Sequence, residues 1–138
     1  MQTEEVRELE TSRVSRQLVM LGGTFGFLAV GLGAFGAHAL KAKLESLGTV
    51  GVFQTASQYH LAHALAILLV AGFAERWQHS RRYATVGWLF ALGILLFSGS
   101  LYLFAVTNLK ALGIFAPFGG ISFLAGWGLL IHTAAQEK

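Results

Sequence analysis

The side chains of this chain that could do chemistry are histidines, serines and tyrosines set within apolar stretches. His60 and His63 are three residues apart, so a helix places both imidazoles on one side, together with small residues such as Ala56 and Ala64. Leucines occupy the opposite side of that helix. Imidazole transfers protons near neutral pH and binds transition metals. The pair therefore suggests a proton relay with Tyr102, or a ligand set for haem or metal in which His38 is the third ligand.

The acidic residues that would complete a catalytic site are missing from the apolar stretches. The chain contains neither aspartate nor cysteine. A serine hydrolase built on Ser98 and His63 would lack the carboxylate that orients its histidine. The missing cysteines exclude disulfides, thiolate zinc sites and iron–sulfur clusters. We therefore expect no enzyme activity, no metal and no cofactor.

The elements that must position these side chains are membrane-spanning helices. Of the 138 residues, 54% are hydrophobic and 12% are charged, whereas a soluble domain has about a quarter charged residues. Four apolar stretches have the length of a bilayer crossing. The chain predicts an all-α fold, a four-helix transmembrane bundle in up-down-up-down order. We expect the spans at about 18–40, 53–77, 83–106 and 113–133.

The remaining segments are polar. Residues 1–17 form a charged N-terminal tail that is either a short helix or disordered, and 18–138 form the membrane domain. Residues 42–47 are expected to add a helical turn at the interface. Seven of the ten lysines and arginines lie in the two termini and the middle loop. By the positive-inside rule both termini are cytoplasmic, as in a multi-pass protein of the bacterial inner membrane. The basic residues form no stripe, so we expect no nucleic-acid partner.

Depth along the helices brings the polar side chains into one layer. At 1.5 Å per residue, side chains from three antiparallel helices reach the outer half of the bilayer. The candidate polar site consists of His38, Tyr59, His60, His63, Ser98, Ser100 and Tyr102. The same groups can instead fix helix register by hydrogen bonding between helices. Both interpretations stay open.

Glycines recur at helical spacing and predict close helix packing. Gly22 and Gly26 form a GxxxG pair, a pattern that lets backbones approach in lipid. The expected packing positions are Gly22, Gly26, Gly33, Gly36, Gly119, Gly120 and Gly126.

Four stretches together resemble a known family. They are Gly-Ala-Phe-Gly-Ala-His-Ala-Leu at 33–40, Gln-Tyr-His-Leu-Ala-His-Ala-Leu at 58–65, Phe-Ser-Gly-Ser-Leu-Tyr at 97–102, and Pro-Phe-Gly-Gly at 117–120 followed by Gly126-Trp127. In this order they resemble domain-of-unknown-function family 423, which includes the eukaryotic transmembrane protein 256. The resemblance covers about 18–133. It implies a four-span membrane protein and no known reaction, and it favours His38, Tyr59, His63, Ser98, Ser100, Tyr102, Pro117 and Gly120 as shared positions.

Two functions remain open from the sequence. The first is a small accessory or assembly subunit of a larger membrane complex, for which the charged tail outside the resemblance is a candidate contact. The second is a small transporter or ligand-binding bundle that uses the polar layer in the outer leaflet. The expected surroundings are the lipid bilayer and either a larger complex or further copies of the chain.

Overall fold

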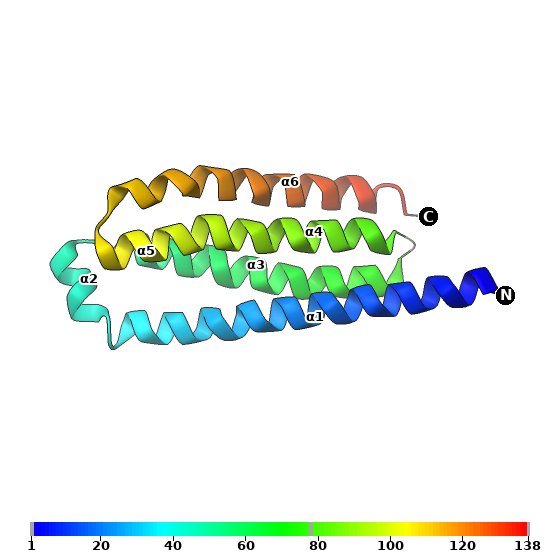
Figure 1. Ribbon diagram of the computed structural model, residues 1–138, viewed down its shortest axis with the longest axis horizontal. Coiled ribbons are helices and arrows are strands. Elements are labelled where there is room, and N and C mark those ends of the chain that lie inside the picture. Colours follow the sequence, from blue (N-terminus) through cyan, green and yellow to red (C-terminus); the bar gives the residue numbers. More distant parts are fainter. Residues whose placement is uncertain (1, 78, 138) are drawn as a thin grey trace.

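The computed structural model describes residues 2–77 and 79–137, and within them every regular element is helical (Figure 1). The elements are α1 (Gln2–Ala37), α2 (Lys41–Leu47), α3 (Val50–Arg76), α4 (Ser80–Gly93), the π-helical segment η1 (Ile94–Gly99), α5 (Ser100–Thr107), the 3-10 segment η2 (Lys110–Phe115) and α6 (Ala116–Ala134). This confirms the all-α fold class.

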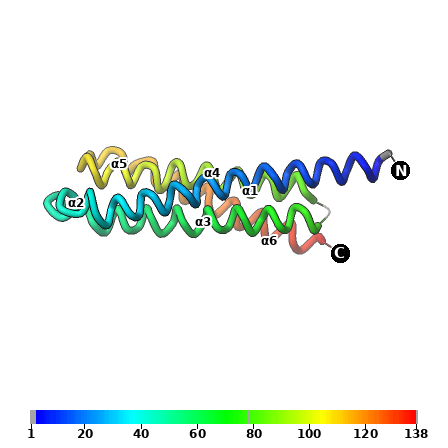
Figure 2. Tube along the Cα trace, turned by 90° about the horizontal axis from the view of Figure 1, so that it is seen from below, coloured from blue at the N-terminus to red at the C-terminus, as the bar shows by residue number. Residues whose placement is uncertain are grey.

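Four long rods make up the bundle. They are α1, α3, the continuous run α4–η1–α5, and η2–α6, and each is long and apolar enough to cross a membrane. Consecutive rods run in opposite directions, and both termini lie at the same end (Figures 1 and 2). Helix α3 packs against α1 and α4, and α4 also packs against α6. The up-down-up-down bundle follows from this order.

Helix α1 is longer at its start than the sequence suggested. Its helix begins at Gln2 and runs without a break to Ala37, after which residues 38–40 form a turn. The tail expected at 1–17 is therefore helical from Gln2, and the first helix ends before residue 40. The physical reason is local: glutamate, arginine and leucine favour helix, and no glycine or proline precedes residue 18.

The end of the bundle opposite the termini is closed by α2 and by two residues with a left-handed backbone conformation. Helix α2 occupies the place of the helical turn expected at 42–47 and stops at Gly48, whose φ is 65°. Asn108 ends α5 with a φ of 58°. The Thr49 hydroxyl donates to the Ala105 carbonyl at 2.7 Å, which ties the start of α3 to α5.

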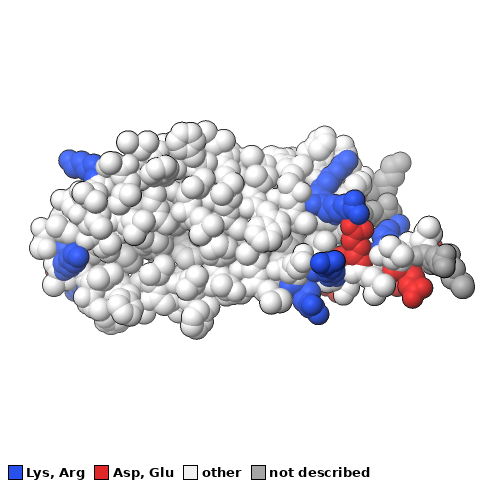
Figure 3. Space-filling view, viewed as in Figure 1, with Lys and Arg blue, Asp and Glu red and all other residues white. Residues whose placement is uncertain are grey.

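The apolar side chains divide into a core and a lipid-facing girdle. Buried residues around Ile67, Tyr83 and Phe90 fill the half of the bundle nearer the termini, while Phe53 and Tyr102 anchor the half nearer α2. Outside, large apolar side chains such as Phe27, Leu124 and Ile131 are exposed. Charged groups gather at the two ends, with an uncharged middle between them (Figure 3). The middle zone matches the hydrocarbon core of a bilayer.

Only some of the expected glycines pack closely. A Cβ on Gly119 would lie 2.3 Å from the Phe97 amide nitrogen, and one on Gly36 would lie 2.2 Å from the Phe53 ring. Gly126 and Gly22 also meet neighbours at 2.6 and 2.9 Å. By contrast, Gly26 and Gly120 meet nothing within 4 Å, and Gly33 meets only the Ser57 hydroxyl at 3.7 Å.

Two packing glycines were absent from the expected set. A Cβ on Gly87 would lie 2.3 Å from Leu18, and one on Gly93 would lie 2.3 Å from Phe123. Spacing along the chain shows that a stripe of small residues exists. It does not show which member of the stripe lies at the helix crossing, because that depends on the neighbouring helix.

Candidate functional site

Helix α3 turns both central histidines into the bundle, but toward different neighbours. His60 is 3% exposed and His63 is 6% exposed. The His60 ring meets the edges of Phe25 from α1 and Tyr102 from α5, with centroids 5.8 and 5.9 Å away. His63 faces α4 and α6. The single polar layer expected from helix depth is therefore two separate contacts.

His63 has both ring nitrogens engaged. The indole Nε1–H of Trp127 lies 3.1 Å from Nε2, and the backbone carbonyl of Tyr59 lies 2.9 Å from Nδ1. An indole nitrogen only donates, so Nε2 accepts and the proton is on Nδ1, which donates to the carbonyl. This pairing fixes one neutral tautomer. Trp127 belongs to the Gly-Trp part of the motif at 117–127 but was not among the predicted site residues.

Aromatic rings surround the His63 imidazole. Phe123 stacks on it with centroids 3.6 Å apart and planes 13° apart, and Tyr59 lies nearly parallel at 6.0 Å. Phe90 meets it edge-on at 5.3 Å. Next to this cluster, a mainly apolar groove of about 420 Å³ opens between α3, η1 and α6. Tyr59, Phe97, Pro117, Gly120 and Trp127 line it with His63.

The close approach at Gly119 positions α6 for these contacts. Because Gly119 has no side chain, the backbone of α6 reaches the backbone of η1 at Phe97. Ser122, one turn further along α6, donates to the Leu89 carbonyl at 2.7 Å. These two contacts hold the following turns of α6, which carry Phe123 and Trp127, against α3.

His60 forms the second polar contact. Its Nδ1 lies 3.4 Å from the Tyr102 hydroxyl, a long hydrogen bond between α3 and α5. Its Nε2 is buried and has no hydrogen-bond partner within the described residues. No hydrogen bond links His60 to His63 in that part of the chain, so the relay of His60, His63 and Tyr102 is not continuous there.

The serines do not join the histidines. Ser100 donates to the Phe97 carbonyl of its own helical run at 3.0 Å. Ser98 is fully buried within η1, and its hydroxyl has no partner among residues 2–77 and 79–137. A π-helical turn shifts side chains relative to a regular helix, which the depth estimate could not include.

His38 lies apart from the other candidates. It is exposed in the turn that follows α1. Among the described residues, no three metal-ligating side chains come together. His38 therefore does not serve there as a third ligand beside His60 and His63.

A polar cluster that the sequence reasoning missed joins the ends of the rods near the termini. Arg81 at the start of α4 pairs with Glu10 of α1. His79 lies 2.9 Å from a Glu137 carboxylate oxygen, and Arg82 bonds Gln136. The signal in the sequence is the position of Glu10. Once α1 is extended back to Gln2, the helical spacing places this carboxylate on the side of α1 that faces Arg81. These bonds fasten α1 and the chain end to the turn between α3 and α4.

These features define a class: a small four-helix membrane bundle whose interior polar groups form contacts between helices. Comparison with known proteins places the chain among membrane proteins of unknown function. A family model described as "Protein of unknown function (DUF423)" matches residues 32–120. The chain belongs to this family, which confirms the resemblance drawn from its four motifs.

Relatives from distant bacteria are similar over nearly their whole length. The UPF0382 membrane protein YwdK of Bacillus subtilis is 42% identical over 118 residues, covering 86% of this chain and 95% of the relative. The UPF0382 inner membrane protein YgdD of Escherichia coli is 41% identical over 126 residues, covering 90% and 93%. No solved structure matches the chain. The relatives' names and the four apolar helices identify the chain as an integral membrane protein.

Proposed function

We propose that this protein is a small accessory or assembly subunit of a larger membrane complex. The observation that carries the proposal is the start of α1, which extends beyond the other rods at the end where both termini lie (Figures 1 and 2). On this extension, Val6 is 63% exposed and Leu9 is 67% exposed. Three residues apart, they lie on the same side of the helix.

Two side-chain contacts join the base of the extension to neighbouring helices. A single isolated helix of this length is marginal in water, but this one continues from a membrane span. The Arg81–Glu10 pair fixes its base to α4, and the Ser15 hydroxyl contacts Glu75 of α3 at 3.4 Å. The turns before Glu10 remain uncovered. We assign the adjacent pair of exposed apolar side chains, Val6 and Leu9, as the part of this helix that a partner covers.

The interior contacts also favour this function over transport. Both ring nitrogens of His63 are engaged within the protein. A proton pathway needs groups that exchange partners, whereas this pairing fixes one tautomer. We assign the histidines the role of holding α3 against α5 and α6, at about 0.6–2 kcal/mol for each hydrogen bond.

The proposed location is the bacterial cytoplasmic membrane, with both termini in the cytoplasm. The Escherichia coli relative is named an inner membrane protein. Most of the lysines and arginines lie at the end that carries the termini. The positive-inside rule then directs the α1 extension toward the cytoplasm, where soluble domains of a complex are accessible.

The test is site-specific photo-crosslinking in native membranes. A photoreactive amino acid replaces Val6 or Leu9, and a control replaces Leu109, which is 60% exposed at the opposite end. We expect Val6 and Leu9 to crosslink to one defined membrane complex, and Leu109 not to do so. Crosslinks only to lipid, or only to a second copy of the chain, contradict the proposal.

A second candidate function is ligand binding in the bundle, favoured by the groove next to His63. The groove is open to the lipid-facing side, since Tyr59 is 44% exposed and Trp127 is 42% exposed. Gly120→Leu would fill it without a backbone clash, because nothing lies within 4 Å of a Cβ there. If the groove binds an apolar ligand, the filled variant loses a small molecule that the wild type retains on purification. Equal retention would exclude this candidate.

A further inference from the structure

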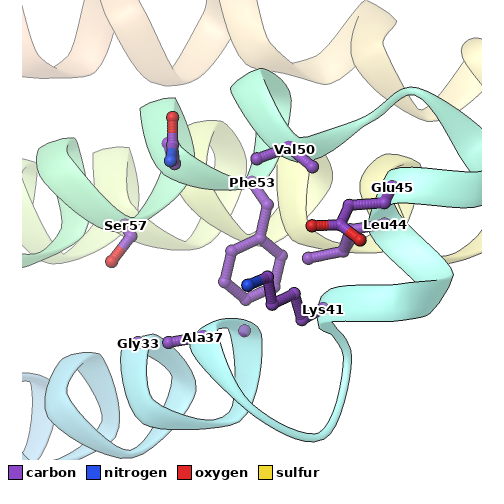
Figure 4. Close-up of a pocket in the computed structure, with 10 residues that line it drawn as sticks. Gly33, Ala37, Lys41, Leu44, Glu45, Val50, Phe53 and Ser57 are labelled. Carbon is purple, nitrogen blue, oxygen red and sulfur yellow. The ribbon is translucent and has the colours of Figure 1, made fainter.

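A second cavity lies at the end of the bundle opposite the termini, where α2 crosses between α1 and α3 (Figure 4). Its volume is about 360 Å³. Gly33 and Ala37 leave the α1 wall nearly bare, and Leu44 and Phe53 provide an apolar floor. This cavity is separate from the groove next to His63 and is independent of the proposed complex.

Two opposite charges stand at the mouth of this cavity. Lys41 and Glu45 are one turn apart on α2, and in Figure 4 the Lys41 side chain crosses the Phe53 ring while the Glu45 carboxylate lies beside it. Both are exposed. Within residues 2–77 and 79–137 neither forms an ion pair, although their spacing would allow one with each other. An ammonium and a carboxylate are therefore available side by side to an incoming ligand.

The polar groups that α3 contributes to the cavity are uncharged. Gln54, which is exposed, offers an amide, and Ser57, half-buried and one turn further along α3, offers a hydroxyl. From the α2 end toward the middle of the bundle, the polar lining is thus charged on α2 and then uncharged on α3, beside an apolar floor. Because α2 connects the ends of two spanning helices, this gradient lies at the membrane interface. A phospholipid presents its groups in the same order from the water inward.

We propose that this cavity binds the headgroup of phosphatidylethanolamine. The phosphate pairs with Lys41, the primary ammonium donates to Glu45, and the ester groups meet Gln54 and Ser57. The first acyl carbons pack on Phe53 and Leu44. The primary ammonium matters because it donates charge-assisted hydrogen bonds to a carboxylate, which a choline group lacks the N–H to do. Phosphatidylglycerol has no cation for Glu45.

The test is native mass spectrometry of the full-length protein with equal amounts of phosphatidylethanolamine, phosphatidylcholine and phosphatidylglycerol. We expect the wild type to retain phosphatidylethanolamine about tenfold more than either other lipid, as one charge-assisted hydrogen bond implies. Glu45→Gln should abolish that preference, whereas Lys41→Gln should lower the retention of all three lipids, because each of them carries the phosphate. Lys43→Gln is the matched control, because Lys43 is exposed on the same helix and does not line the cavity. It should retain the preference.

A cavity-filling variant tests the location without changing charge. Gly33→Leu places a side chain in the cavity, since the nearest atom to its Cβ is the Ser57 hydroxyl at 3.7 Å. Gly31→Leu is the control, with nothing within 4 Å and no part in the lining. We expect only Gly33→Leu to lose the lipid.

Three results would overturn the assignment. The first is equal retention of all three lipids by the wild type. The second is unchanged retention in Lys41→Gln, Glu45→Gln and Gly33→Leu. The third is binding of soluble glycerophosphoethanolamine as tight as that of the lipid, which would identify a water-soluble zwitterion as the ligand.

Discussion

The indole Nε1–H of Trp127 donates a 3.1 Å hydrogen bond to Nε2 of His63, across the interface between α6 and α3. The bond sets the tautomer of the histidine, whose Nδ1–H then donates to the Tyr59 carbonyl at 2.9 Å. It also joins two motifs that are 64 residues apart in the chain. Helix packing therefore connects two of the four motifs directly.

Trp127→Phe should destabilise the bundle by about 1–2 kcal/mol, because it leaves His63 Nε2 buried without a partner. Thermal unfolding in detergent measures the effect. Trp88→Phe is the control, since Trp88 is 58% exposed on the lipid-facing side, and it should change stability by less than about 0.5 kcal/mol. Equal stability of the two variants would mean that the indole bond contributes nothing.

Gly119→Ala should be among the most damaging single-methyl changes in the chain. Its Cβ would lie 2.3 Å from the Phe97 amide nitrogen, and backbone cannot move aside as a side chain can. We expect a loss of about 2 kcal/mol or more, the range of overpacked cores. Gly120→Ala is the adjacent control with nothing within 4 Å. If both variants unfold at the same temperature, α6 does not contact η1 at this point.

The two glycines of the GxxxG pair should respond with opposite sign. Gly26→Ala meets nothing within 4 Å and should gain up to about 1 kcal/mol from helix propensity. Gly22→Ala places its Cβ 2.9 Å from Leu68 and 3.1 Å from the Ala64 carbonyl oxygen, so the cost of crowding exceeds that gain and the variant is less stable than the wild type. Unfolding measurements should therefore rank Gly26→Ala above Gly22→Ala. The reverse order would place the α1–α3 crossing nearer Gly26.

The proposed orientation predicts which positions are accessible from each side of the membrane. The chain has no cysteine, so single-cysteine variants report unambiguously. Ser46→Cys on α2 should react with a membrane-impermeant maleimide added outside intact cells. Ser12→Cys on α1 should react only after permeabilisation. Both positions are exposed. The opposite labelling pattern would place the termini outside the cytoplasm.

The sequence predicted the architecture well because lipid imposes a simple rule. In lipid, the backbone N–H and C=O groups of an apolar stretch must hydrogen-bond to each other, which a helix allows. The spans can therefore be predicted from the length and composition of the apolar stretches. The side of α3 that carries His60, His63 and Ala64 was also predictable, because helical phase is regular. The structure confirms that these residues are buried while Leu65 and Leu69 are exposed.

The relation between helices was not predictable in the same way. Helix depth placed His60, His63 and Ser98 at one level, but it gives no direction across the bundle. His60 contacts α1 and α5, His63 contacts α4 and α6, and Ser98 is shifted by the π-helical turn. The cavity under α2 depends on how that short helix folds back, which no periodicity indicates.

The most direct test of the proposed subunit role is the mass and composition of the particle that contains this chain after gentle extraction from its own membrane. We expect a particle with a second membrane protein at fixed stoichiometry, lost when Val6→Glu and Leu9→Glu are combined. Adding the same charge at the other end, with Leu109→Glu and Ala111→Glu, should leave the particle intact. A wild-type chain that elutes alone, or only with copies of itself, would contradict the role.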